Sequence, residues 1–170
     1  MYPEESAMIK IKPATTKSDF ECISKLAHEI WHEHYPAIIS LEQIAYMLEK
    51  FNSVTAIDNQ TKTGSQFFYM TYNDVPVGYA AIKKESDFLF LEKLYILEGY
   101  RGKKMATAAI QFMEAFANYL SISKIKLNVN KYNVNSILAY KKMGFVETKS
   151  MVTDIGNGFV MDDYEMEKVF

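Results

Sequence analysis

The chain has 170 residues, the length of one ordinary domain, and a formal net charge of −2 at pH 7. Hydrophobic residues make up 49% and charged residues 24%, which is typical of a folded globular protein. This balance argues against a nucleic-acid binder, and no apolar run reaches the roughly 18–20 residues of a membrane span. A single cysteine, and an N-terminus with neither a basic nor an apolar region, predict a cytoplasmic protein with one domain over residues 1–170.

The first part of the chain predicts one strand followed by helices. Residues 8–13 alternate apolar and basic side chains, which favours a strand. A helix is expected to begin at Ser18, because Glu21 stands three residues later in the position that completes a capping box. A second helix is expected at Ser40, with Gln43 in the matching position, and a short third helix over residues 53–62.

From Gln66 the pattern changes to β-rich runs at residues 67–72, 77–83 and 88–97, joined by short turn-like segments. Three strands connected so tightly predict an antiparallel meander. The expected order then continues with a long helix, a strand at 125–129, a short helix at 133–143 and strands at about 145–153 and 159–168. This order predicts an α/β sandwich around a mixed sheet.

A loop rich in glycine and cations opens the long helix, with the sequence Arg-Gly-Lys-Lys-Met-Ala from Arg101 to Ala106. Free backbone N–H groups and the helix dipole, worth about half a positive charge, favour an anion at such a position. Neighbouring lysines strengthen the case for a phosphate ligand. The loop lacks the glycine order of a P-loop, and Lys104 stands where the dinucleotide fingerprint needs glycine.

Two segments together resemble the GNAT superfamily of acetyl-coenzyme A-dependent N-acetyltransferases. Residues 101–106 are similar to its Arg/Gln-x-x-Gly-x-Gly/Ala signature, with Lys104 in place of the central glycine. Residues 133–145 are similar to its Asn-x-x-Ala/Ser-x-x-x-Tyr-x-Lys-x-Gly-Phe segment. The resemblance is strongest over residues 66–170. It implies an α/β (α+β) fold with a mixed, mostly antiparallel sheet of about six to seven strands flanked by helices, acetyl-coenzyme A as co-substrate, and no metal.

The resemblance also implies roles for individual residues. A bulge in the strand ending at Leu97 makes room for the pantetheine arm, and a backbone N–H there polarises the acetyl carbonyl, an effect worth about 3–4 kcal/mol. Tyr140 is the expected general acid, because a phenol with a pKa of about 10 is protonated at neutral pH. The expected cofactor-binding residues are Leu94, Tyr95, Ile96, Arg101, Gly102, Lys103, Lys104, Met105, Ala106, Thr107, Asn133, Tyr140 and Lys142. Asn133 is also a candidate helix N-cap.

Glu92 is the candidate base for the incoming amine, directly or through water. A carboxylate among the apolar side chains of Phe90, Leu94 and Ile96 is expected to have a raised pKa. The alternative is an edge-exposed glutamate paired with Lys93 or Lys103.

The acceptor site of the family lies between the first two helices and the last strands, so Trp31 and Tyr35 are the expected substrate-binding residues. Residues 30–35 resemble bacterial spermine/spermidine-type acetyltransferases. Glu33, Asp162 and Asp163 then supply negative charge for a polyamine, unless they are ordinary solvated surface. A small-molecule amine is the expected partner, with no nucleic acid or membrane, and a homodimer is a further possibility.

Two other functions stay open at this point. Residues 28–32 spell His-Glu-Ile-Trp-His, the pattern of a zinc peptidase, but helical spacing places His28 and His32 on the face opposite the apolar stripe. A zinc site also needs a third ligand and an enclosed cleft. The second alternative is a GNAT-fold domain that binds acetyl-coenzyme A as a sensor without catalysis, which the Lys104 departure keeps open.

Overall fold

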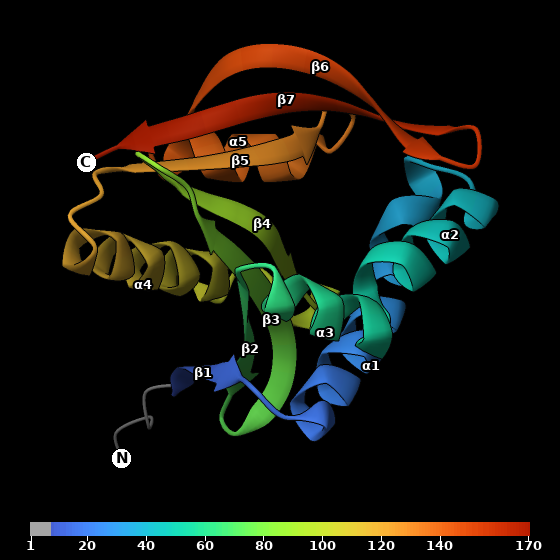
Figure 1. Ribbon diagram of the computed structural model, residues 1–170, viewed down its shortest axis with the longest axis horizontal. Coiled ribbons are helices and arrows are strands. Elements are labelled where there is room, and N and C mark those ends of the chain that lie inside the picture. The colour runs from blue at the N-terminus through green and yellow to red at the C-terminus, as the bar shows by residue number, and fades with distance from the viewer. Residues whose placement is uncertain (1–7) are drawn as a thin grey trace, which may run out of the picture.

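The computed structural model describes residues 8–170, so the N-terminal residues without a secretion pattern lie outside the described part. A seven-stranded sheet in the order β1-β2-β3-β4-β5-β7-β6 separates two groups of helices (Figure 1). This mixed, mostly antiparallel sheet confirms the expected fold. The strands are β1 (Ile9–Ala14), β2 (Ser65–Tyr72), β3 (Val75–Lys84), β4 (Leu89–Ile96), β5 (Lys124–Asn130), β6 (Val146–Gly156) and β7 (Phe159–Val169).

Helices pack on both faces of the sheet, and no helix among residues 8–170 is long and apolar enough to cross a membrane. One face packs against the helices before β2, in a core that includes Ile30, Ile44 and Phe67. The other packs against α4 and α5, in a core that includes Met113 and Leu127. The helices are α1 (Lys17–His34), α2 (Leu41–Asn52), α3 (Val54–Lys62), α4 (Met105–Tyr119) and α5 (Val134–Lys142), with 3-10 turns η1 (Tyr35–Ala37) and η2 (Glu98–Tyr100).

The predicted start of the first helix was wrong by two residues. Thr16 is the N-cap of α1, and its hydroxyl accepts from the amide of Asp19, whose carboxylate accepts from the Thr16 amide. Ser18 lies inside the helix, because the Thr16–Asp19 pair already completes a capping box. The second N-cap is confirmed, since the Ser40 hydroxyl accepts from the amide of Gln43.

The strands β4 and β5 form the only parallel pair in the described sheet, and they separate soon after they meet. Their pairing runs only from Leu89 opposite Ile125 to Leu91 opposite Leu127. In contrast, β4 stays paired with β3 as far as Ile96 opposite Gly78. Figure 1 shows β4 diverging from β5 beyond this short contact. One edge of β4 therefore has backbone groups without a strand partner.

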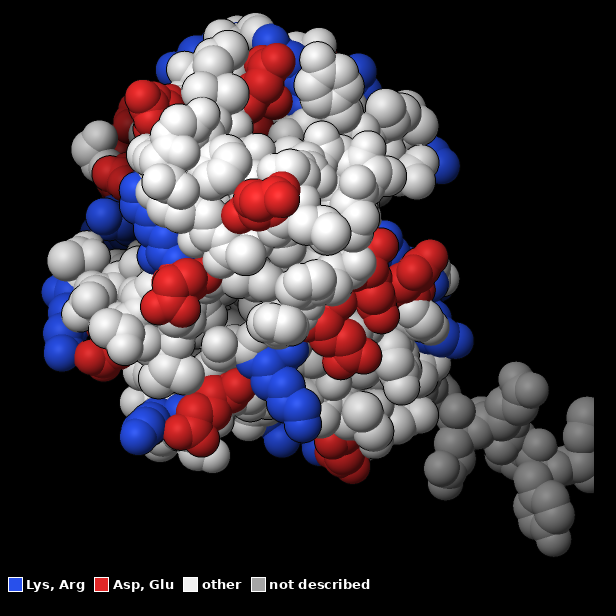
Figure 2. Space-filling view, turned by 90° about the vertical axis from the view of Figure 1, so that its right-hand side faces the viewer, with Lys and Arg blue, Asp and Glu red and all other residues white. Residues whose placement is uncertain are grey.

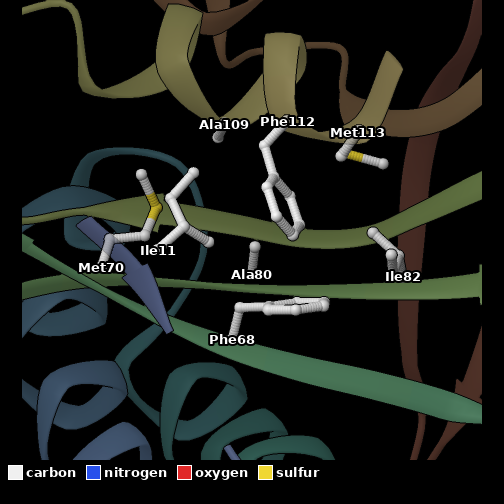
Figure 3. Close-up of a pocket in the computed structure, with 8 residues that line it drawn as sticks. All are labelled: Ile11, Phe68, Met70, Ala80, Ile82, Ala109, Phe112 and Met113. Atoms are coloured by element: carbon white, nitrogen blue, oxygen red, sulfur yellow. The ribbon is translucent and has the colours of Figure 1, made fainter. Parts of the chain in front are cut away.

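A small apolar cavity of about 10 Å³ lies between α4 and the sheet (Figure 3). The Phe112 ring points from α4 toward the sheet, where Phe68 and Ala80 lie beneath it. A cavity of this size holds at most about one water molecule, and a water needs polar partners that these side chains do not offer. This cavity is a packing gap rather than a ligand site.

Candidate active site

The predicted bulge is present in β4, and it occurs where β4 leaves β5. Ala81 of β3 pairs with Lys93, and the next residue, Ile82, pairs with Leu91, so Glu92 is the extra residue. A bulge bends its strand and locally increases the twist. Beyond it, Leu94 to Ile96 keep one edge on β3 while the other edge faces the divergence. These are the backbone positions that the sequence assigned to the cofactor arm.

Gly78 allows β3 to lie close beside this end of β4 in the sheet. A Cβ atom on Gly78 would come within 2.7 Å of the Tyr95 carbonyl oxygen and 3.2 Å of Ile96 Cγ1. Contacts this short do not occur between a real Cβ and a backbone oxygen. The absence of a side chain at Gly78 therefore sets the position of the free edge of β4.

The loop before α4 ends in an uncapped helix N-terminus. Lys104 is the N-cap, has φ 65° and ψ 18°, and makes no side-chain capping bond. The first helical bond joins the amide of Ala108 to the carbonyl of Lys104, so the amides of Met105 to Thr107 have no acceptor within the helix. Lys103 and Lys104 are exposed beside them. Free amides, the dipole and two ammonium groups together suit a phosphate.

Lys104 occupies the left-handed region, which glycine adopts without cost. A residue with a Cβ pays roughly 1–2 kcal/mol there. The backbone nevertheless keeps the turn that exposes the amides of α4. Lys104 is therefore a strained position in a loop that leaves the first amides of α4 free.

Arg101 points back toward β4 rather than toward the start of α4. Its Nε donates to the carbonyl oxygen of Ile96 over 3.3 Å, and its Nη1 lies 3.4 Å from His34 Nδ1. Burial lowers the pKa of His34, the Arg101 charge lowers it further, and a hydrogen bond with Asn133 opposes both. Asn133 is buried at the N-cap position of α5, but its side chain makes no capping bond. These three side chains link the end of α1 to both sides of the divergence.

Four aromatic side chains lie beside the free edge of β4, on the face of the sheet that packs against α1 and α2. They are Trp31, Tyr35, Tyr79 and Tyr95. The Trp31 ring lies 4.5 Å from that of Tyr35 and 5.3 Å from that of Tyr95, between centroids. The Tyr35 hydroxyl donates to the Tyr95 hydroxyl at 3.5 Å. The predicted substrate residues Trp31 and Tyr35 are therefore buried next to the backbone that the cofactor arm is expected to follow.

Tyr140 reaches the same place from the opposite face. Its ring lies edge-on to Phe145, with centroids 5.6 Å apart, and burial raises its pKa to about 12. Burial also raises the pKa of Tyr35 and Tyr95, and the charges of ionised Tyr140 and Asp163 raise both further. Tyr35 and Tyr95 thus lie within the electrostatic reach of both Tyr140 and Asp163. Tyr140 stays protonated at neutral pH, as a general acid must.

Glu92 does not have the environment that the sequence suggested. Because the bulge places it on the face opposite Leu94 and Ile96, its carboxylate meets polar rather than apolar groups, and Oε1 accepts from the Ser65 hydroxyl at 2.5 Å. Lys93 does not pair with it; Lys93 Nζ donates to Gln60 Oε1 at 2.9 Å and to the carbonyl of Phe51. Glu92 lies three residues before Tyr95, but the bulge shortens this separation to about 7–8 Å along the strand.

Asp163 is the residue that sequence reasoning undervalued. It is only 8% exposed, and its Oδ1 has no hydrogen-bond partner among residues 8–170. Burial and the charge of Asp162 raise its pKa to about 6, against a smaller opposing effect of Lys131. Sequence alone offered little signal, because Asp163 is one of two adjacent acidic residues in a strand that looks polar.

The other two acidic candidates are engaged elsewhere. Asp162 forms a 2.8 Å ion pair with Lys131, and Glu33 Oε2 accepts from the backbone amide of Glu98 at 3.2 Å.

Figure 2 shows the side with α1, α2 and the tip of the β6–β7 hairpin, where cationic side chains are scattered and do not form a basic patch. Lys142 is exposed near the end of α5.

The zinc-peptidase pattern has no supporting geometry. His28 and His32 are exposed on α1, their rings 4.5 Å apart, and His32 Nδ1 lies 2.7 Å from the carbonyl oxygen of His28. Within the described range 8–170, no group of three or more His, Cys, Asp and Glu side chains is arranged to hold a metal ion. The solvent-facing position predicted for the two histidines is confirmed.

Comparison with known proteins agrees with this geometry. The model of the acetyltransferase (GNAT) family matches residues 24–145. A PaiA N-acetyltransferase from Thermoplasma acidophilum, solved in complex with coenzyme A, is 24% identical with a TM-score of 0.79, over 96% of this chain and 99% of that one. The ribosomal-protein-S18-alanine N-acetyltransferase of Escherichia coli is 15% identical with a TM-score of 0.71, over 95% and 94%. These two likenesses establish a shared fold.

Proposed function

We propose that this chain, which belongs to the acetyltransferase (GNAT) family, moves the acetyl group of acetyl-coenzyme A to a primary amine by direct attack in a ternary complex. One observation carries the proposal. The Tyr140 phenol packs on one face of the sheet and the hydrogen-bonded Tyr35–Tyr95 pair on the other, close enough that the charge of ionised Tyr140 raises the pKa of both tyrosines. An acid and an acceptor site are thereby brought to the same free backbone edge.

Acetyl-coenzyme A fits the groups that this region offers. The uncapped start of α4 supplies amides for phosphate oxygens, with Lys103 and Lys104 beside them. The unpaired edge of β4 from Leu94 to Ile96 suits the amide groups of the pantetheine arm, which need partners of the kind a strand edge provides. The coenzyme A complex of the similar Thermoplasma acidophilum enzyme supports this choice of co-substrate.

The residues around the free edge of β4 have specific roles in the proposed acetyl transfer. A backbone N–H on the free edge of β4 hydrogen-bonds the acetyl carbonyl oxygen, where negative charge develops during attack. Tyr140 gives its proton to the departing thiolate, which its raised pKa of about 12 leaves available throughout the neutral range. Glu92, held by Ser65 at the bulge, acts on the amine through water in this proposal, since it lies about 7–8 Å along the strand from Tyr95.

The acceptor is proposed to be a small alkylamine. The rings of Trp31 and Tyr35 pack together beside the free edge of β4, and aromatic rings attract an ammonium group. A polyamine is the narrower proposal, supported by the resemblance of residues 30–35 to spermine/spermidine-type enzymes. A homodimer through the C-terminal strands is also a proposal, in keeping with the exposed apolar side chains of Val146 and Val152 on the edge strand β6.

An assay of thiol release tests the proposal directly. The protein is mixed with acetyl-coenzyme A and a panel of amines that includes spermidine, butylamine and an N-terminal alanine peptide, and free thiol is followed over time. Release that depends on both an amine and the protein is the expected result. Calorimetric binding of acetyl-coenzyme A without release for any amine would instead identify a non-catalytic sensor.

A further inference from the structure

Asp163 of β7 lies level with Tyr95 of β4, on the other side of the place where β4 and β5 diverge. The strand registers show this. Leu91 of β4 is opposite Leu127 of β5, so after the bulge Tyr95 stands level with the end of β5 at Asn130. Asn130 in turn pairs with Asp163 of β7. By the same register, Glu92 lies near the closed end of the divergence and Asp163 near its open end.

The Asp163 side chain is on the face that carries the aromatic cluster. Side chains alternate along β7, and Met161, two residues earlier, packs against the core under α1 and α2. Met166, on the opposite alternation, packs in the core under α4 and α5. The electrostatic effect of Asp163 on both Tyr35 and Tyr95 agrees with this placement.

Nothing within residues 8–170 neutralises this carboxylate. Lys131 is the nearest cation that influences it, but Lys131 is ion-paired with Asp162 at 2.8 Å and lies 5.4 Å above the ring of Tyr164. Oδ1 of Asp163 has no hydrogen-bond partner in the same range, and the side chain is more than nine-tenths buried. A buried carboxylate without a partner is costly, and such groups persist where a ligand supplies the missing charge.

We propose that Asp163, with the hydroxyls of Tyr35 and Tyr95, binds the ammonium group of an alkylamine acceptor and takes its proton. This inference rests on the proposed acetyl transfer and names the group that selects a cationic acceptor. An ammonium ion is complementary to the site because it has three donors, a full positive charge and an affinity for aromatic faces.

The proton transfers balance with the residues already described. The Asp163 carboxylate takes one proton from the ammonium, and the neutral nitrogen forms a C–N bond to the acetyl carbon as the C–S bond breaks. The thiolate takes the Tyr140 proton, and a second nitrogen proton restores the phenol. The amide keeps the third proton, and Asp163 releases its proton to solvent.

The only tryptophan of the chain reports on this site, because the Trp31 ring packs at a tilt against the rings of Tyr35 and Tyr95. Titration of the whole protein with butylammonium at pH 7.5 should change Trp31 fluorescence, while the neutral isostere butanol should not. In Asp163→Asn the dissociation constant for butylammonium should rise about tenfold or more. The matched neighbour Asp162→Asn, whose charge is already paired, should stay within about twofold of the wild type.

The pH dependence of binding provides a second readout. Asp162, Lys131, Tyr35, Tyr95 and Tyr140 are the titratable groups around Asp163, and the tyrosines stay neutral below pH 10. Wild-type binding of butylammonium should therefore weaken as pH falls through about 6, where Asp163 gains a proton. Asp163→Asn should lose this dependence and, free of a buried charge, should have a higher Tm at pH 7.

The outcomes separate the two proposals. Failure of the wild type to bind butylammonium, or equal binding by Asp163→Asn, overturns the role of Asp163 even if thiol release is observed. Binding that depends on Asp163 without any thiol release overturns acetyl transfer but leaves the ammonium site standing. If Glu92→Gln reproduced the binding loss and Asp163→Asn did not, the site would belong to Glu92.

Discussion

Trp31 and Tyr79 join α1 to β3 through one buried hydrogen bond, in which the indole N–H donates to the phenol oxygen over 3.0 Å. The Tyr79 hydroxyl in turn donates a hydrogen bond to Asn52 Oδ1 at 3.0 Å. The ring of Tyr79 also lies 5.3 Å from that of Tyr95, between centroids. This chain of contacts fixes the aromatic wall against which the acceptor is proposed to bind.

Tyr79→Phe should therefore lower both stability and acceptor affinity. It leaves the Trp31 N–H and the Asn52 oxygen buried without a partner, and each such group costs about 1–3 kcal/mol. Chemical denaturation should show a loss of this size. Tyr119→Phe, at a position 86% exposed, is the control and should not change the free energy of unfolding. An unchanged stability in Tyr79→Phe would mean that water replaces the hydroxyl.

Tyr140→Phe tests the general acid. Turnover should fall by about 10²–10⁴-fold, while the calorimetric affinity for acetyl-coenzyme A should change little, because the hydroxyl acts on the leaving group. With a pKa of about 12, Tyr140 should cause no loss of wild-type turnover between pH 7 and 10. The exposed Tyr132→Phe should keep full turnover. The assignment fails if Tyr140→Phe turns over like the wild type.

Two substitutions at Lys104 test the left-handed turn before α4. Lys104→Gly and Lys104→Ala remove the same charge, but only glycine relieves the conformation at φ 65°. Lys104→Gly should thus be more stable than Lys104→Ala by about 1 kcal/mol and should bind acetyl-coenzyme A more tightly. Denaturation and calorimetry measure the two effects. Equal behaviour of the two variants would show that the turn carries no strain.

Gly78→Ala tests the close approach of β3 to the end of β4 that carries the free edge. The added Cβ would lie 2.7 Å from the Tyr95 carbonyl oxygen, so β4 has to move. Overpacking of this kind costs about 1–3 kcal/mol, and the cofactor affinity should fall with it. Gly99→Ala is the matched control, because a Cβ there meets nothing within 4 Å. Wild-type affinity in Gly78→Ala would argue against cofactor binding along this edge.

The lowered pKa of Lys93 predicts that the stability of the protein rises with pH. Burial lowers the pKa of Lys93 from its ordinary value of 10.5 to about 8, so the folded protein favours the neutral amine above this pH. Between about pH 8 and 10.5 the unfolded chain binds more protons than the folded one, and stability therefore increases with pH. Relative to Lys93→Met, the wild type should gain about 1–3 kcal/mol across this range. Parallel pH curves for the two proteins would refute the shift.

Much of the architecture was predictable from the sequence because its signals are local. The change from helical to alternating spacing near Gln66 located the meander, and Ser40 marked the start of a helix. The segments 101–106 and 133–145 are contiguous motifs, so their order along the chain was enough to predict a strand edge, a helix start and Tyr140 around one site. The first capping box was misplaced because Thr16 and Ser18 both have the right chemistry, and the choice depends on where the chain leaves β1.

The roles of the carboxylates depended on long-range pairing. A one-residue bulge moved Glu92 to the face opposite Leu94 and Ile96, and its partner Ser65 lies 27 residues away in sequence. Asp163 became buried only because β7 pairs with β5, which places it opposite Asn130 and beside two tyrosines from distant segments. Sequence by itself therefore determined the family and most of the elements, and it supplied Tyr140 as the candidate acid, since these follow from local patterns. Which carboxylate is buried beside the divergence of β4 and β5 was decided by strand register, a property of residues far apart in the chain.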